Sequence, residues 1–509
     1  MNSSNNRGSS KRIAKNTMVL YVRMLVVTLV GLYTSRVILK ALGIEDYGLY
    51  SVVGGVVSLF SFFRSSMEKC TQRFLNVEMT SPNGRLKETF NNALIIHAVI
   101  AVAALVLSET VGLWFLNTYI QIPSNRIFAA NCVYQTVVGG LLLTILTIPY
   151  SATIIANERM SIFAFISVFE CLFNLIIAFI ISSFQTDKLI LYSILLLLSR
   201  IIIFSFYVIY CHRKFEETSL HLVYDKGICK EMLGYTSWTL VGHAMILGTN
   251  QGNSILVNMF HGVTSNAAMA VANQVNSHVL QLTGNFQTAF NPQITKAYAS
   301  GEFEYLRKLV FSTSKLSYFL LFVVSLPLLL NIDLVLDVWL VEVPVQANIF
   351  CILMISSGIL QATTSPLNFS IMATGKIKWF QIITGLVFLS DLVILYFLFK
   401  LGLPAPTAMW VKLSIMVVVT VVRLFFAHRL ISSLSIVDYL REVIVPLLIT
   451  TAISLTIALL LMGLAHSVTG QIAVTAIYTL LSVAMVYFIG LSSFEKQMLK
   501  SLIAKKKKL

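Results

Sequence analysis

Residues Leu189–Tyr210 read LILYSILLLLSRIIIFSFYVIY, and this stretch decides the class of fold. Its only charged residue is Arg200, and a helix needs about 20 apolar residues to cross about 30 Å of hydrocarbon. Similar runs recur along the chain, in which 57% of residues are hydrophobic and 12% are charged. Because soluble domains carry about a quarter charged residues, the composition excludes a water-soluble fold. The sequence therefore predicts an all-α protein that crosses a membrane many times.

Fourteen membrane spans are predicted, and the gaps between them are too short to bury a core of their own. The first fifteen residues are polar and basic, so no signal peptide is expected. The six cysteines form no CxxC motif or Cys/His cluster, so neither a disulfide nor a metal site is predicted. The predicted spans cover residues 16–39, 46–63, 90–116, 127–155, 160–183, 189–210, 232–260, 266–290, 309–331, 345–373, 379–399, 406–428, 443–464 and 471–491.

Basic residues are distributed unevenly between the two sets of loops. With the N-terminus inside, the inner loops and tails hold 27 Lys and Arg residues and the outer loops hold 4. Cytoplasmic loops carry such an excess in membrane proteins, so both termini are predicted to be cytoplasmic. The net charge of +15 then reflects membrane topology, and no nucleic-acid partner is predicted.

Two stretches of the chain resemble each other at an offset of 219 residues. Ser35–Gly55 reads SRVILKALGIEDYGLYSVVGG, and Ser254–Gln274 reads SILVNMFHGVTSNAAMAVANQ. In both, an apolar helix end is followed by a glycine (Gly43, Gly262), a polar turn and small residues. A second pair starts at Thr147 and Thr364 and places a proline inside each span, Pro149 and Pro366.

A repeat of about 218 residues covers six spans, an even number, so both copies have the same orientation in the membrane. We therefore predict two six-helix lobes followed by two further spans. The expected domains are a cytoplasmic tail (1–15), an N-lobe (16–215), a C-lobe (216–430), spans 13 and 14 (431–491) and a basic cytoplasmic tail (492–509). Rocking of two lobes around a central cavity would give alternating access, whereas a rigid duplicated channel is the alternative.

The N-terminal motifs NTMVLYVR (Asn16–Arg23), Ser35-Arg36 and LGIEDYGLY (Leu42–Tyr50) resemble the polysaccharide (O-unit) flippases of the multidrug/oligosaccharidyl-lipid/polysaccharide (MOP) exporter superfamily. The resemblance implies a V-shaped pseudo-two-fold fold in the bacterial inner membrane. It also implies export of an undecaprenyl-pyrophosphate-linked oligosaccharide, an O-antigen (lipopolysaccharide) or capsule repeat unit, from the cytoplasmic to the periplasmic leaflet. The implied partners are this substrate, the bilayer and a polysaccharide polymerase. No catalytic residue and no cofactor are implied.

Charged residues inside the spans point to an anionic substrate. Each cation at mid-bilayer costs about 2.5–3.5 kcal/mol on the insertion scale, so such residues are usually functional. Candidate ligands for the pyrophosphate are Arg23, Arg200, Lys412 and Arg36. Arg36, like Lys315 and Arg423, lies near a span end, where its long side chain can reach the membrane surface. The acids of the spans are Glu109, Glu170 and Asp391.

Hairpin spacing puts two acids level with two bases. Glu170 lies 15 residues before Gln185 and Arg200 lies 15 after it, so at 1.5 Å per residue they share a depth. Around Gly402, the same arithmetic pairs Asp391 with Lys412. The pairs either lock helices together or line a cavity, where the bases would meet pyrophosphate and the acids would couple transport to an ion or proton.

Predicted spans 7 and 8 are rich in carboxamides, which must face other helices or water because lipid cannot satisfy them. Carboxamides both donate and accept hydrogen bonds, as sugar hydroxyls do. The candidate sugar ligands are Asn250, Gln251, Asn273, Gln274 and Gln281, and interhelical hydrogen bonding is the alternative for each. His243 and His278 are expected to be packing residues.

Other function classes fit less well. The chain has no GxxxxGK[ST], HExxH or GxSxG motif, so neither a built-in ATPase nor an enzyme is predicted. A polysaccharide polymerase would need a large outer loop, and the longest outer stretch here, Ile332–Pro344, is short. A cation-coupled multidrug exporter on the same architecture remains the alternative function. Six cations against three acids in the spans favour the flippase.

Overall fold

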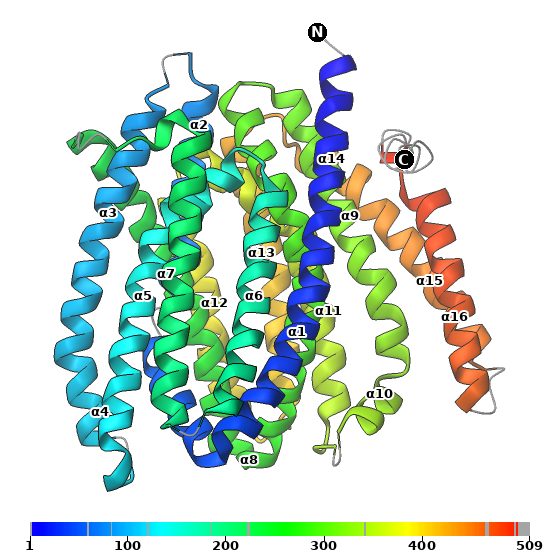
Figure 1. The fold of residues 1–509 in the computed structure, drawn as a ribbon. Coiled ribbons are helices and arrows are strands. Elements are labelled where there is room, and N and C mark those ends of the chain that lie inside the picture. Colours follow the sequence, from blue (N-terminus) through cyan, green and yellow to red (C-terminus); the bar gives the residue numbers. More distant parts are fainter. Residues whose placement is uncertain are drawn as a thin grey trace. The chain divides into compact units, whose positions relative to one another are not determined.

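A computed structural model describes residues 3–58, 61–82, 84–119, 122–184, 186–220, 224–340, 343–463, 468–492 and 495–496. Within these residues all regular secondary structure is helical, with no strand, and the helices are joined by turns and loops. The helices are α1 (Ser3–Ser58), α2 (Ser61–Thr80), α3 (Leu86–Leu107), α4 (Leu113–Tyr119), α5 (Ile127–Ala156), α6 (Met160–Ser183), α7 (Lys188–Lys214), α8 (Lys226–Ala299), α9 (Phe303–Leu330), α10 (Ile332–Trp339), α11 (Ala347–Thr374), α12 (Lys378–Lys400), α13 (Thr407–Leu430), α14 (Ile436–Tyr439), α15 (Val445–Met462) and α16 (Val468–Met485). Figure 1 shows their course.

Eleven helices of the described chain are long and apolar enough to cross a membrane, which confirms the predicted all-α, multi-pass class. The predicted span at 160–183 coincides with α6, and ten other predicted spans overlap the remaining apolar helices. The prediction at 46–63 begins in the second part of α1, passes residues 59–60, which lie outside the described residues, and ends in α2. The predictions at 232–260 and 266–290 fall on α8. Amides lower the hydropathy of α8 below that of an ordinary span.

Two glycines bend the two longest helices in the same way. Gly43 has φ 80° and ψ 170° inside α1, and Gly262 has φ 78° and ψ −176° inside α8. This region of backbone space is essentially restricted to glycine, because a Cβ atom would clash there with the backbone. The predicted correspondence of the two glycines is therefore confirmed in their conformation. Pro149 and Pro366, the second predicted pair, lie inside α5 and α11.

Residues 64–80, which we expected to form part of a cytoplasmic loop, belong to α2. Met67, Cys70, Phe74 and Leu75 are buried, and their spacing of three and four residues places them on one helix face. Leu75 packs with Tyr150 of α5, whereas Cys70 Sγ lies 3.6 Å from the Met232 carbonyl and the Phe74 ring meets that of Tyr235, both on the first part of α8. Sequence hydropathy missed the helix because its other face is polar, and Lys69 is exposed there.

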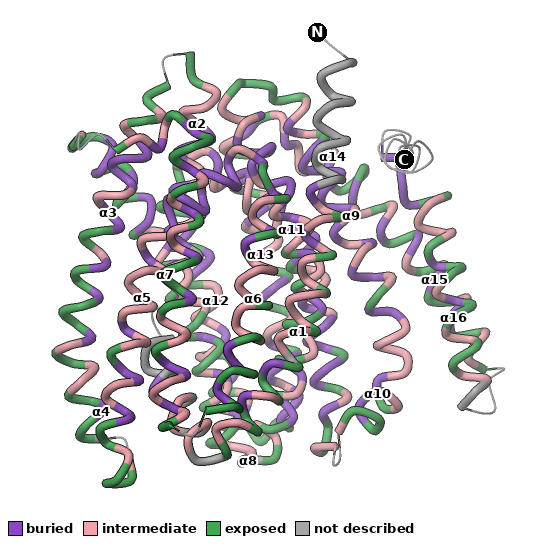
Figure 2. The backbone as a smooth tube through the Cα atoms, in the orientation of Figure 1, coloured by how far each residue is buried: buried purple, intermediate pink, exposed green. Residues whose placement is uncertain are grey.

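The chain forms two compact units, one of residues Asn16–Leu240 and one of Val241–Leu509 together with Met1–Lys15. In the first unit, α5 packs against α2, α3 and α7, and Figure 1 shows α5, α6 and α7 as neighbouring helices. Buried positions recur every three or four residues along α3, at Phe90, Ala93, His97, Ala101 and Ala104. Figure 2 shows this pattern as alternating bands along the helix.

In the second unit, α11 packs against α9 and α13. One apolar cluster of this unit includes Phe350, Leu395, Met409 and Val419, all nearly inaccessible to solvent. These residues come from different helices of the unit. Close packing of this kind fixes the rotation of each helix about its own axis. It thereby sets the direction in which the functional side chains of that helix point.

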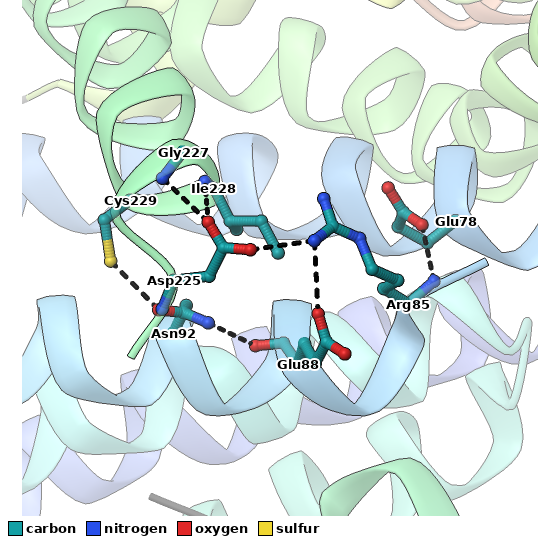
Figure 3. A network of polar contacts seen from close by, with 8 residues as sticks. All are labelled: Glu78, Arg85, Glu88, Asn92, Asp225, Gly227, Ile228 and Cys229. Atoms are coloured by element: carbon teal, nitrogen blue, oxygen red, sulfur yellow. Dashed lines mark hydrogen bonds and ion pairs between the residues drawn. The ribbon is translucent and has the colours of Figure 1, made fainter. Parts of the chain in front are cut away.

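The segment that leads into α8 is fixed to α3 by the polar network drawn in Figure 3. Asp225 accepts hydrogen bonds from the backbone N–H groups of Gly227 (2.7 Å) and Ile228 (3.1 Å), and Arg85 Nη1 donates to its second oxygen at 2.8 Å. Asn92 Oδ1 accepts from the Asp225 backbone N–H at 2.9 Å. The bonds from Ile228 and Gly227, together with the nearby Arg85, lower the pKa of the Asp225 carboxyl. The carboxylate therefore caps α8 and ties the start of this helix to α3.

Candidate functional site

Arg200 and Glu170 form an ion pair in the first unit. Arg200 Nη1, on α7, donates to Glu170 Oε1, on α6, at 2.5 Å, which confirms the pairing predicted from hairpin depth. The Arg200 side chain is 44% exposed and that of Glu170 is 27% exposed. A guanidinium has five N–H donors, so one carboxylate does not satisfy it. Arg200 thus has unused donors at mid-span depth, where contact with lipid would be costly.

Aromatic and amide groups lie around this ion pair. The Tyr50 hydroxyl is within electrostatic range of Arg200, and the Tyr50 ring meets that of Tyr192 edge-on at 5.1 Å. Ser199 Oγ donates to Asn174 Oδ1 at 3.2 Å. Sequence reasoning missed these neighbours as site residues. Two features of the sequence could have identified them. Tyr50 belongs to the LGIEDYGLY motif, and Asn174 lies one helical turn after Glu170 and so on the same helix face.

The second predicted pair does not close. Asp391 and Lys412 are both described, and no ion pair joins them. Instead, Asn253 Nδ2 donates to Asp391 Oδ2 at 2.9 Å, and Lys412 Nζ donates to Asn250 Oδ1 at 3.2 Å. The two side chains therefore make no direct ion pair, because α8 presents two amides, one turn apart, to α12 and α13. Their expected place on one shared cavity stays a prediction. Equal depth alone does not set the azimuth of either side chain.

Asp391 lies in an unusual environment for a carboxylate. The residue is 1% exposed. Within the described chain, neither its Oδ1 nor the neighbouring Oδ1 of Asn253 has a hydrogen-bond partner. A buried acceptor oxygen without a partner is costly unless a proton or a cation satisfies it. The Asp391 carboxyl is therefore a candidate site for a proton or a monovalent cation.

The amides of α8 divide into two groups. Asn250 and Gln251 are exposed, as are Asn273, Gln274 and Gln281, and in the second half of α8 Ser277 and His278 share the exposed face. Gln287 is instead buried, and its Nε2 donates to Ser317 Oγ at 3.3 Å and to the Ala362 carbonyl at 3.1 Å. Gln287 thus joins helices. The five predicted sugar ligands are all exposed, so the described part of the chain leaves them uncovered, and their role stays a prediction.

The remaining pyrophosphate candidates lie on α1. The Arg23 guanidinium stands 4.7 Å from the centroid of the Phe163 ring, a cation–π geometry, and its side chain is half-buried. Two turns earlier, Asn16 Nδ2 donates to the Glu158 carbonyl at 3.2 Å, which fixes the start of the span to the loop before α6. Arg36 is exposed on the same helix, seven residues before the Gly43 bend.

Three other charges inside spans have structural partners. Lys315 Nζ pairs with Glu495 Oε2 at 2.8 Å, and both side chains are almost fully buried. Arg423 Nη1 donates to the Thr364 hydroxyl at 2.7 Å. Gln135 Nε2 donates to Glu109 Oε2 at 3.0 Å. These charges contribute to packing between helices. Within the described residues, no group of three His, Cys, Asp or Glu side chains could hold a metal ion, and all six cysteines are free.

No family model matches the sequence, and no curated protein matches it. Solved structures do match the fold. The crystal structure of a MATE point mutant aligns with a TM-score of 0.72 at 12% identity, covering 84% of this chain and 97% of its own. The fold is that of MATE transporters. An outward-facing multidrug resistance MATE transporter, itself of the MOP superfamily, aligns with a TM-score of 0.68 at 12% identity, over 84% of this chain and 96% of its own.

A MOP superfamily transporter from Pyrococcus furiosus aligns equally well, with a TM-score of 0.68 at 13% identity, over 84% of this chain and 96% of its own. That protein is described as having a binding pocket of reversed polarity that suggests a different function. At 12–13% identity these alignments establish the shared MATE fold and leave the substrate to be argued from the residues of this chain.

Proposed function

We propose that this protein exports an undecaprenyl-pyrophosphate-linked oligosaccharide from the cytoplasmic to the periplasmic leaflet by alternating access. The observation that supports this most is Arg200, a half-exposed guanidinium at mid-span depth that has one carboxylate partner among the described residues. Guanidinium binds pyrophosphate through parallel hydrogen bonds and keeps its charge at any physiological pH. Glu170 holds Arg200 in position by occupying one nitrogen and leaves the other donors for the substrate.

The other groups have complementary roles in this proposal. Lys412, Arg23 and Arg36 supply further positive charge for the pyrophosphate. The exposed amides of α8 bind the sugar hydroxyls, because they donate and accept in equal measure. The polyprenyl chain is too long and apolar to leave the bilayer. The chain works in the bacterial inner membrane with both termini in the cytoplasm, where the lipid-linked sugar is made.

The test is complementation of the source bacterium after deletion of its chromosomal copy. Arg200→Ala is expected to abolish surface polysaccharide and to trap the lipid-linked oligosaccharide in the inner leaflet, with the protein inserted and abundant. Arg213→Ala is the matched control, because Arg213 is exposed at the end of the same helix. Normal polysaccharide in the Arg200→Ala strain would refute the assigned role of Arg200.

A second function, cation-coupled export of small drugs, is favoured by the buried Asp391 and its unpartnered oxygen. A proton or sodium ion bound there and released on the other side would drive an antiporter. The discriminating experiment is dye efflux from vesicles with an imposed proton or sodium gradient. Efflux that Asp391→Asn abolishes, in a strain where Arg200→Ala leaves polysaccharide normal, would favour the drug exporter over the flippase.

A further inference from the structure

The second unit contains a cavity of about 480 Å³ away from the amides of α8. It lies among α9, the start of α15, the helical turn Val486–Gly490 that extends α16, and the segment that follows this turn. Charged groups line one part and apolar groups another. The full lining is Arg307, Lys308, Phe311, Ser312, Lys315, Glu442, Pro446, Ile489, Gly490, Leu491, Ser492 and Glu495.

Two of the lining charges neutralise each other. Lys315 and Glu495 form a 2.8 Å ion pair, 7% and 1% exposed. Glu495 Oε2 also accepts from the Ser492 backbone N–H at 2.7 Å. Breaking such a buried pair would leave an uncompensated charge in a membrane span, so it stays closed. The pair forms a neutral wall and is not available to a ligand.

The remaining charges leave carboxylates in excess beside one free base. Arg307 pairs with three carboxylates, through Nη1 with Glu442 at 3.2 Å and Asp438 at 3.4 Å and through Nε with Glu304 at 3.9 Å, so one guanidinium charge is shared by three acids. Of these acids only Glu442 lines the cavity. Lys308 is exposed at the cavity, and it has no ion-pair or hydrogen-bond partner within the described part of the chain. A ligand that carries one negative and one positive charge could pair with Lys308 and with Glu442.

The apolar side of the cavity indicates a lipid. Phe311, Pro446 and Ile489 belong to helices that cross the membrane, so this wall is continuous with the acyl-chain region. Lys315 lies seven residues beyond Lys308 on α9, about 10 Å deeper along the helix. The free lysine is at the end of α9 that is expected to face the cytoplasm, at headgroup level.

We propose that this cavity binds a phospholipid of the inner leaflet whose headgroup carries a phosphate and a primary ammonium, as phosphatidylethanolamine does. Lys308 Nζ donates to the phosphate, and the ammonium donates to the Glu442 carboxylate that Arg307 only partly neutralises. The first acyl carbons pack on Phe311 and Ile489. A quaternary ammonium has no N–H donor for Glu442, and a glycerol headgroup has no positive charge, so both should bind less tightly.

The test is native mass spectrometry of the delipidated full-length protein, titrated in detergent with phosphatidylethanolamine, phosphatidylglycerol and phosphatidylcholine of identical acyl chains. We expect phosphatidylethanolamine to bind most tightly. Lys308→Gln should weaken it about tenfold, the change that accompanies loss of one charge-assisted hydrogen bond. Lys376→Gln, which removes an exposed lysine elsewhere in the same unit, should leave binding unchanged.

Two further arms distinguish the possible ligands. Glu442→Gln should remove the preference for phosphatidylethanolamine over phosphatidylglycerol, and an unchanged preference would overturn the assignment of the ammonium. O-phosphoethanolamine, which has the headgroup without acyl chains, should bind much more weakly than the lipid. Equal binding would assign the cavity to a soluble ligand and overturn the proposal, as would a Lys308→Gln protein that binds the lipid normally. Lipid binding is measured without transport, so the result is independent of the proposed function.

Discussion

Gly43 and Gly262 adopt the same backbone conformation 219 residues apart, with φ 80° and 78° and ψ 170° and −176°. Each interrupts one long helix at the matching point of the predicted repeat. Apart from the adjoining residues and the backbone of the same helix, no atom of the described chain lies within 4 Å of the place where a Cβ would stand at either glycine. Glycine is therefore not required here by packing against other parts of the chain. It is required by the backbone conformation.

Replacement of Gly262 by alanine isolates this backbone requirement. Gly262→Ala should destabilise the protein by about 1–3 kcal/mol, the usual range for a non-glycine residue held in such a region, although the Cβ has free space. Gly248→Ala is the matched control, because Gly248 also has open space around its Cβ but lies within regular helix. It should be neutral or stabilising by up to about 1 kcal/mol. Thermal unfolding in detergent measures both, and equal effects would contradict the backbone argument.

Substitutions at Arg200 and Glu170 can distinguish the contribution of positive charge to transport from the contribution of hydrogen-bond geometry. Arg200→Lys retains the positive charge but loses the planar fork that binds two phosphate oxygens, so we expect surface polysaccharide to fall by about tenfold without being abolished. Glu170→Gln keeps the shape of the partner and should have a smaller effect. Quantified polysaccharide at matched protein abundance checks both. An Arg200→Lys strain with normal polysaccharide would show that charge alone suffices.

The Asp225 cap predicts how stability depends on pH. The pKa of this carboxyl is lowered in the folded protein, so its ionised form stabilises the fold above the unfolded pKa of about 4. That contribution is lost as the pH falls through about 4 toward the lower folded value. The melting temperature of Asp225→Asn should therefore lie below that of the parent from about pH 5 to 7, and the difference should shrink toward about pH 3.

Glu231→Gln is the control for this titration, because Glu231 is exposed on the same helix, further along from the cap. Its melting temperature should follow that of the parent at every pH. A difference between Asp225→Asn and the parent that stays constant down to about pH 3 would refute the assignment of the effect to ionised Asp225.

The buried pair of Lys315 and Glu495 predicts a non-additive double-mutant cycle. Lys315→Met leaves the Glu495 carboxylate buried without its cation and should cost about 3–5 kcal/mol. Adding Glu495→Gln removes the uncompensated charge, so the double variant should recover most of the loss. Unfolding of the two single variants and the double variant by denaturant gives the coupling. Additive effects would contradict a direct interaction between the two side chains.

Several features could be read from the sequence because they depend on periodicity and covalent spacing. The apolar runs set the class of fold, and the bounds of α6 match the predicted span. The two glycines were recognisable since only glycine readily adopts their backbone conformation. Arg200 and Glu170 meet because residues at equal distances from a short hairpin turn lie at equal depth.

Only the tertiary structure decided which neighbours the charged residues contact, because helical spacing sets the depth of a side chain and not the direction in which it points. The same arithmetic that joined Arg200 to Glu170 places Lys412 level with Asp391, yet each of these two residues binds an amide of α8 and no direct ion pair joins them. The helix α2 was missed because its polar face offsets its buried one in hydropathy. The partner of Lys315 is Glu495, 180 positions away, and long-range packing of that kind leaves no periodic trace in the sequence.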